Sequence, residues 1–220
     1  CLTRTRLTMP KPLPTFLEET YLWNKGYSLI AGLDEVGRGA FAGPVVVAAV
    51  VFPTNHVFID PLLFEINDSK KLSTKKRQEL AKSIKREARS YKITEGSIED
   101  INTLGIGKAT QQAFLEATTT LKIKPDFYLI DAFYIEGLDK EIQKPIIHGD
   151  TLSISIAAAS IIAKVYRDEL MQTYHNDYPE YNFLENKGYG TAFHRAQLGE
   201  YGLSPLHRTS FSLEKFLPQK

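Results

Sequence analysis

The stretch that most constrains the fold covers residues 29–52 and reads LIAGLDEVGRGAFAGPVVVAAVVF. Two apolar runs flank a glycine-rich segment, a pattern that predicts two strands of one sheet joined by a turn. The acidic pair Asp34 and Glu35 closes the first run. Adjacent residues of a strand point to opposite faces, so both carboxylates can serve one site only if the strand ends there. Burying them without a partner would be costly.

The tripeptide Gly37-Arg38-Gly39 follows the acidic pair directly. Glycines let the backbone approach a ligand closely and present its N–H groups. Carboxylates beside N–H groups and an arginine suit a metal ion and a phosphate together. In most proteins an acidic pair next to glycine is only turn chemistry. Here the strongly apolar flanks place the acids at the rim of a buried sheet, which favours a functional site.

Length and composition limit the remaining possibilities. A chain of 220 residues can form one sizeable core with a small appendage. The net charge is only +1, so any nucleic-acid-binding face must come from local clustering of basic residues. Cys1 is the single cysteine, which excludes a disulfide within the chain and a cysteine-based zinc site. Because the sequence has neither a membrane-spanning run nor a signal-peptide pattern, we expect a cytoplasmic protein without a membrane partner.

The rest of the sequence alternates between helical and extended patterns. We expect helices over residues 15–25, 73–90, 103–121, 153–174 and 192–201, and strands over 91–97, 126–131 and 145–148. Acidic residues in 98–102 could open the helix at 103–121. The order of strand, helix and strand between residues 91 and 131 implies a parallel crossover. Residues 1–12 are basic, contain two prolines and are expected to be poorly ordered.

Two further acids lie where such a fold places functional groups. Asp131 ends an apolar strand, and open α/β sheets place their sites at the carboxyl ends of strands. Asp150 stands just before the long helix, where the helix dipole also favours a negative charge. Asp168 lies well inside that helix, four residues after Lys164. We therefore predict that Asp168 serves a structural ion pair or helix packing and is not a metal ligand.

Four carboxylates in one place repel one another unless a cation neutralises them. Oxygen-only ligands indicate Mg²⁺ or Mn²⁺ and not zinc. Two such ions roughly 4 Å apart can activate a water molecule and stabilise the leaving oxygen in phosphodiester cleavage.

Several motifs resemble type 2 ribonuclease H (ribonuclease HII). Residues 34–39 match the family signature Asp-Glu-x-Gly-Arg-Gly without a break, and residues 68–70 match its Asp-Ser-Lys motif. Gly149-Asp150 precedes AASIIAKVYRD at residues 158–168, the longest match in the chain. The family usually carries His-Lys-Gly-Tyr in a later loop, and this chain has Asn186 where that histidine stands. The departure puts in doubt only the supporting role of that position, because Tyr189 is present.

The resemblance implies an α/β, ribonuclease H-like fold with a mixed central sheet flanked by helices and a small C-terminal helical part. It also implies three segments: a tail and short helix at 1–28, a catalytic domain at 29–178 and an extension at 179–220. The roles it implies fall into two sets. The catalytic metal ligands are Asp34, Glu35, Asp131 and Asp150, and the substrate-binding residues are Gly37, Arg38, Gly39, Ser69, Lys70 and Tyr189.

The activity implied is endonucleolytic hydrolysis of RNA in RNA–DNA hybrids, by a monomer, leaving 5′-phosphate and 3′-hydroxyl ends. It includes cutting 5′ of single ribonucleotides embedded in duplex DNA. One alternative is another nuclease of the ribonuclease H superfamily, against which the glycine-rich motifs argue. The other is a duplex-binding module without catalysis. Four retained carboxylates argue against such a module, because a binder gains nothing from negative charge facing phosphates.

Overall fold

The computed structural model describes residues 13–218, so the expectation about residues 1–12 lies outside the described part. Its centre is a five-stranded sheet in the order β3-β2-β1-β4-β5. The strands are β1 (Ile30–Val36), β2 (Val45–Val51), β3 (Ser90–Gly96), β4 (Phe127–Asp131) and β5 (Gln143–Ile146). Strand β1 pairs antiparallel with β2 and parallel with β4, so the sheet is mixed, as predicted.

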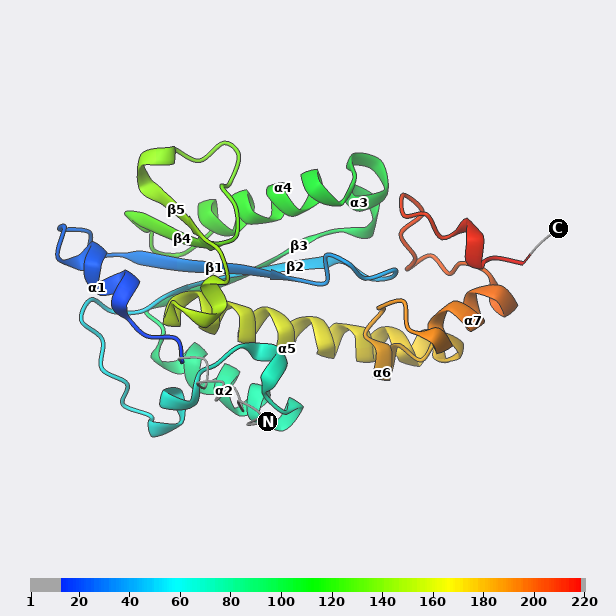
Figure 1. Ribbon diagram of the computed structural model, residues 1–220, viewed down its shortest axis with the longest axis horizontal. Helices are drawn as coiled ribbons and strands as arrows, with labels where there is room; N and C mark the ends of the chain where they lie inside the picture. Colours follow the sequence, from blue (N-terminus) through cyan, green and yellow to red (C-terminus); the bar gives the residue numbers. More distant parts are fainter. Residues whose placement is uncertain (1–12, 219–220) are drawn as a thin grey trace, which may run out of the picture.

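Helices cover both faces of the sheet (Figure 1). They are α1 (Leu17–Trp23), α2 (Thr74–Glu87), α3 (Ile98–Leu104), α4 (Ile106–Thr119), α5 (Ile154–Asp177), α6 (Phe183–Asn186) and α7 (Ala192–Tyr201). In Figure 1, α3 and α4 lie on one face, and α2 and α5 lie on the other. The molecule is elongated in this view, with α6 and α7 at one end. No helix among residues 13–218 is long and apolar enough to cross a membrane.

The predicted helix over residues 103–121 is present as α4, but the acidic residues 98–102 that were expected to open it belong to a separate helix, α3. Gly105 separates the two helices with a φ of 82°. Helix α3 begins after Ser97, where Ser97 and Asp100 form a capping box. Glycine adopts a positive φ without strain, so the chain turns at residue 105 before the second helix starts.

Close packing between β1 and α5 fixes the centre of the molecule. A Cβ atom on Gly32 would lie 2.1 Å from the carbonyl carbon of Ser155, so only glycine fits at this contact. The small residues Ala157, Ala158 and Ala159 are fully buried on the same helix. The apolar run in α5 is thus buried, as predicted, and the helix lies directly over the strand that carries Asp34.

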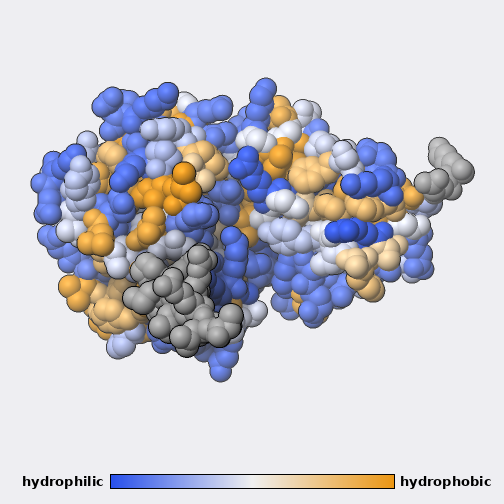
Figure 2. All heavy atoms as spheres, viewed as in Figure 1, coloured by the Kyte–Doolittle hydropathy of each residue, from blue (hydrophilic) through white to orange (hydrophobic). Residues whose placement is uncertain are grey.

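The C-terminal part has a core of its own against the far end of α5. Met171 of α5 packs with Ala42, Tyr181, Phe183 and Leu198. Helix α5 ends at Asp177, one residue before the boundary expected from the sequence. We therefore propose that the chain divides into the segments 1–28, 29–178 and 179–220. Hydrophobic side chains on the face shown in Figure 2 form small patches among hydrophilic ones.

Candidate active site

Two acids meet where parallel strands end together. Leu33 of β1 is in register with Ile130 of β4, so the next residues, Asp34 and Asp131, follow at the same edge of the sheet. Alternation along β1 directs Asp34 and Glu35 to opposite faces. All three acids nevertheless line one cavity of about 420 Å³, because β1 ends at Val36.

Asp150 lies beside this cavity and does not line it. It belongs to a short 3-10 turn, and the N–H of Gly149 in that turn donates to Asp131 Oδ1 at 2.8 Å. The backbone is left-handed at Ala132, with φ of 67°, and at His148, with φ of 58°. Such a conformation is uncommon outside glycine. These two turns therefore hold Asp131 and Asp150 next to each other after neighbouring strands.

Burial and mutual repulsion disfavour ionisation of the acids. Burial raises the pKa of Asp34 well above its usual value, and Glu35 adds to the effect. The pKa of Glu35 rises to about 7 through burial and the charge of Asp131, although Arg38 opposes the shift. Burial raises the pKa of Asp150, and Asp131 contributes further. A group of carboxylates with these shifts is stabilised by a nearby cation.

The donor set fits a hard divalent cation. The Oε2 atom of Glu35 is buried and has no hydrogen-bond partner within residues 13–218. An unsatisfied carboxylate oxygen beside Asp34 and Asp131 is a ligand of the kind that Mg²⁺ and Mn²⁺ prefer. No three His, Cys, Asp or Glu side chains in the described part of the chain form a ready-made metal site. A bound cation would therefore have to draw the carboxylates closer together.

The turn that carries Ser69 and Lys70 borders the same cavity. Asp68 shapes it, because Asp68 Oδ1 accepts a hydrogen bond from the Lys70 N–H at 3.0 Å. The hydroxyl groups of Ser69 and Ser160 lie 3.1 Å apart. A hydrogen bond from Ser160 also acts to lower the pKa of Asp34, against the effect of burial. Ser160 thus links the turn to the strand that carries Asp34, a role that the sequence analysis missed.

A buried arginine holds the glycine-rich turn after β1. Arg208 is fully buried, and its guanidinium donates to the carbonyl oxygens of Gly37 at 2.7 Å, Arg38 at 2.8 Å and Gly43 at 2.9 Å. Burial lowers the pKa of Arg208 to about 9, and the charge of Arg167 adds to the shift. The turn is therefore fixed by a residue that lies far along the chain.

Arg167 of α5 is the second fully buried arginine. It donates to the carbonyl oxygens of Ala42 and Pro44 at 3.0 Å and of Lys187 at 2.8 Å. Its guanidinium carbon lies 5.5 Å from the centre of the Tyr189 ring. The arginine thereby joins the segment after the glycine-rich turn to the loop that presents Tyr189, which lines the cavity.

Asn186 shapes the loop before Tyr189. Its side-chain Nδ2 donates to the Tyr181 carbonyl oxygen at 2.6 Å, and its Oδ1 accepts from the Gly188 N–H at 2.8 Å. The Tyr189 N–H donates to the Asn186 carbonyl oxygen at 2.9 Å. The Asn186 side chain therefore forms hydrogen bonds with backbone groups of the turn that presents Tyr189.

A pair of buried histidines supports the same loop. His194 Nδ1 lies 3.0 Å from the Tyr189 carbonyl oxygen, which can only accept, so this nitrogen carries a proton. The Ser204 N–H donates to His207 Nδ1 at 2.9 Å, so that nitrogen carries none. The contact of 2.9 Å between the two Nε2 atoms is then a hydrogen bond from His207 to His194. Both rings are neutral in this arrangement.

The structure thus brings Asp34, Glu35, Asp131, Ser69, Lys70 and Tyr189 to one cavity. Arg38 does not line it. Its side chain is half exposed and lies 4.0 Å from Glu35, beside a neighbouring surface depression. The sequence analysis did not assign Arg167, Arg208, His194 or His207 to the site. Arg167, Arg208 and His194 contact backbone carbonyl oxygens of the glycine-rich turn, the segment after it and the Tyr189 loop. His207 contacts His194. Of the four, only Arg167 lies inside a motif of the resemblance described above.

Comparison with known proteins agrees with this geometry. A model of the ribonuclease HII family matches residues 31–214. Ribonuclease HII of Syntrophus aciditrophicus (strain SB) is 48% identical over 203 residues, which cover 91% of this chain and 92% of that protein. Ribonuclease HII of Clostridium beijerinckii is 49% identical over 185 residues, which cover 84% of this chain and 68% of that protein.

Solved structures show the same fold. Ribonuclease H2 from Pyrococcus horikoshii OT3 superposes with a TM-score of 0.72 at 23% identity, covering 85% of this chain and 95% of that one. Ribonuclease HII in a complex with PCNA from Archaeoglobus fulgidus gives a TM-score of 0.69 at 26% identity, covering 87% and 97%. With a mixed five-stranded sheet, flanking helices and these relatives, the chain belongs to the ribonuclease HII family of endoribonucleases.

Proposed function

We propose that this ribonuclease H cuts the RNA strand of RNA–DNA hybrids and also cuts 5′ of single ribonucleotides embedded in duplex DNA. The observation that carries the proposal is one cavity lined by three carboxylates together with Ser69, Lys70 and Tyr189. Acids for metal ions, a lysine for phosphate and an aromatic ring for a sugar or base are the groups that this reaction needs. The expected monomeric state and cytoplasmic location remain predictions.

The proposed metal ligands are Asp34, Glu35, Asp131 and Asp150. These residues would hold two Mg²⁺ or Mn²⁺ ions, which when bound would activate a water molecule and stabilise the leaving 3′-oxygen. Asp131 is held in place by the Gly149 N–H, so its second oxygen can face the cavity. The products expected are a 5′-phosphate and a 3′-hydroxyl.

The glycine-rich turn is proposed to recognise the ribose. Arg208 occupies the carbonyl oxygens of Gly37 and Arg38, which therefore face the protein. The N–H groups of Arg38 and Gly39 make no hydrogen bond within residues 13–218. A 2′-hydroxyl can accept as well as donate. We infer that it accepts from these N–H groups and that Tyr189 stacks on the sugar of the following nucleotide.

The test is cleavage of a DNA duplex that contains one ribonucleotide, with the products mapped to the nucleotide. The wild-type protein should cut 5′ of the ribonucleotide only when Mg²⁺ or Mn²⁺ is present. Asp131→Asn should lower turnover about 10³-fold, because it removes the negative charge of a proposed metal ligand. Each tenfold loss corresponds to about 1.4 kcal/mol of transition-state stabilisation. Asp150→Asn should be less severe, because Asp150 lies beside the cavity and does not line it.

Asp126→Asn is a matched control at the other end of β4. Asp126 accepts hydrogen bonds from the N–H groups of Ser28 and Leu29 at 2.7 and 2.9 Å, away from the cavity, so this change should leave turnover intact. Near-normal turnover by Asp131→Asn would remove Asp131 from the site. Binding without metal-dependent cleavage would favour a non-catalytic module. Cleavage of hybrids alone would favour another nuclease of the superfamily.

A further inference from the structure

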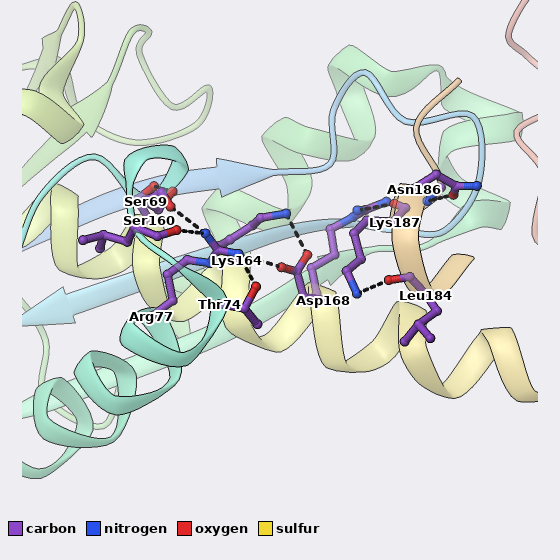
Figure 3. Close-up of polar contacts among 12 residues, drawn as sticks. Ser69, Thr74, Arg77, Ser160, Lys164, Asp168, Leu184, Asn186 and Lys187 are labelled. Atoms are coloured by element: carbon purple, nitrogen blue, oxygen red, sulfur yellow. Dashed lines mark hydrogen bonds and ion pairs between the residues drawn. The ribbon is translucent and has the colours of Figure 1, made fainter. Parts of the chain in front are cut away.

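Lys164, Asp168 and Arg77 form a group of three charged side chains that contact one another (Figure 3). Lys164 lines the active-site cavity. Lys164 Nζ lies 2.7 Å from Asp168 Oδ1, and Arg77 Nη2 lies 3.6 Å from Asp168 Oδ2. The side chains are 17%, 9% and 11% exposed for Lys164, Asp168 and Arg77. The prediction that Asp168 pairs with Lys164 is confirmed. The structure adds Arg77 as a second partner from α2.

The charges in this group do not balance. One carboxylate serves two cations, and the next residue along α5, Arg167, binds only backbone carbonyl oxygens. Buried charges are stable only when they are paired and hydrogen-bonded. The group therefore carries a net positive charge beside a cavity whose acids are expected to be neutralised by metal ions, and this charge can attract a phosphate.

Lys164 is the member of the group that reaches the cavity. It lines the same cavity as Asp34, Ser69 and Lys70. Ser160, one helical turn earlier on α5, also lines it and contacts Ser69. The α5 face that ends at Lys164 and the turn that ends at Lys70 thus form two walls of one site.

Arg77 connects the charged group to the second wall. Its Nη1 donates to the carbonyl oxygen of Ser69 at 3.0 Å and also to that of Leu72. Its Nη2 donates to the Thr74 hydroxyl at 3.2 Å and lies near Asp168. Asp168 is therefore tied to Lys164 on one side and, through Arg77, to the turn that presents Lys70 on the other.

We propose that Lys164 is a second phosphate-binding lysine of the active site, and that Asp168 and Arg77 are positioning residues that fix its distance from Lys70. The inference rests on the proposed nucleic-acid substrate. Lys164 and Lys70 hold the phosphates of the cleaved strand from two walls of the cavity. The carboxylate of Asp168 restrains the ammonium of Lys164 without neutralising the whole group.

The test compares Lys164→Met with Lys164→Arg on a duplex containing one ribonucleotide. Lys164→Met should lower kcat/KM about 10- to 100-fold and reduce the salt dependence of duplex binding by about one phosphate contact. Lys164→Arg keeps the charge and should keep the salt dependence. Lys70→Ala should show the same reduction as Lys164→Met. Lys82→Met changes an exposed lysine of α2 and should match the wild type.

Asp168→Asn tests the positioning role separately. It leaves both cations in place, so the salt dependence should stay that of the wild type, while KM should rise because Lys164 and the Ser69–Lys70 turn are less restrained. A purely structural ion pair would predict a lower melting temperature for Lys164→Met, with kinetic constants and salt dependence unchanged. That result would overturn the proposal. Absence of wild-type cleavage would instead overturn the proposed function.

If Lys164→Met does not fold, the proposal can be tested on the wild-type protein by measuring how a bound duplex protects its lysines from chemical modification. Reductive methylation of lysines is followed by mass spectrometry with and without an all-DNA duplex, which the enzyme does not cut. Lys164 and Lys70 should both be protected by the duplex, whereas Lys82 should not. An unchanged rate of Lys164 methylation alongside protection of Lys70 would contradict the proposal.

Discussion

Glu35 shows at the level of one residue how the site depends on a cation. Its pKa is raised from 4.5 to about 7 in the folded protein. Between pH 4.5 and pH 7, Glu35 is therefore protonated in the folded protein but ionised in the unfolded chain. Folding stability therefore falls as pH rises from 4.5 through 7. Each pKa unit corresponds to about 1.4 kcal/mol, which gives an effect on the order of 3 kcal/mol.

The measurement is the free energy of unfolding of the wild type and of Glu35→Gln at pH 5 and pH 8, without metal. The wild type should lose stability relative to the variant between these two pH values. Adding Mg²⁺ should reduce that loss, because a bound cation favours the ionised carboxylate. A difference between the two proteins that does not change with pH would show that Glu35 does not titrate in this range.

Tyr189 is the residue at which we expect substrate preference to be set. Tyr189→Ala should lose much more activity on a single embedded ribonucleotide than on a long RNA–DNA hybrid, because only the former depends on one sugar contact. Tyr189→Phe keeps the ring and should separate stacking from the hydroxyl contact. The measurement is the ratio of kcat/KM for the two substrates. Equal loss on both would make Tyr189 a packing residue, consistent with its contact to Arg167.

The acids could be found from the sequence, whereas the buried arginines could not. Asp131 ends the apolar strand β4, and Asp34 follows the apolar run of β1 two residues before that strand ends. Acids after apolar runs of neighbouring strands predict a shared edge of the sheet. Arg167 and Arg208 bind backbone carbonyl oxygens, and every residue of a chain has such an oxygen. No complementary residue type marks such contacts, so only the folded backbone reveals them.

At the scale of elements, the contact between β1 and α5 is the tightest constraint near the site. Gly32→Ala would bring a Cβ atom to 2.1 Å from a backbone carbon of Ser155. Overpacking of this kind costs about 1–3 kcal/mol or more. Turnover should fall as well, since a shift of β1 moves Asp34 relative to α5.

Gly107→Ala in α4 is the matched control for the prediction at Gly32. Nothing lies within 4 Å of a Cβ atom at residue 107, and alanine favours a helix by roughly 1 kcal/mol over glycine. This variant should be more stable than the wild type. Both changes are read from denaturant unfolding, and equal stability of the two variants would contradict the close contact.

Element types were predictable where periodicity was strong. The paired strands at residues 30–36 and 45–51 and the long buried helix α5 follow from their apolar patterns. The break between α3 and α4 was not predicted, because a glycine within a helical pattern does not by itself reveal whether the helix ends. The capping box at Ser97 and Asp100 was the signal that could have located the start of α3.

For the whole molecule, the two buried histidines join the C-terminal segment to the active-site loop. The pKa of His207 is lowered from 6.5 to about 4 by burial and by the neighbouring His194. The unfolded chain therefore binds more protons between these values, so stability falls as pH is lowered from 6.5 towards 4. The expected loss is on the order of 3 kcal/mol.

Titration of the histidine ring signals by NMR tests this prediction. His207 should stay neutral until about pH 4, and the signals of Tyr189 should shift over the same range, because His194 contacts its carbonyl oxygen. A His207 that titrates near 6.5 would contradict the hydrogen-bonded pair.

The contact between Arg208 and the glycine-rich turn also bears on when the enzyme becomes active during its synthesis. Its three acceptors lie at residues 37, 38 and 43, about 170 positions earlier in the chain. Protein chains leave the ribosome in order, and their amino-terminal parts fold first. The sheet and its acids can therefore form while the glycine-rich turn, which we propose recognises the ribose, still lacks its support. The active site is therefore completed only after residue 208 has been synthesised and has folded against the turn.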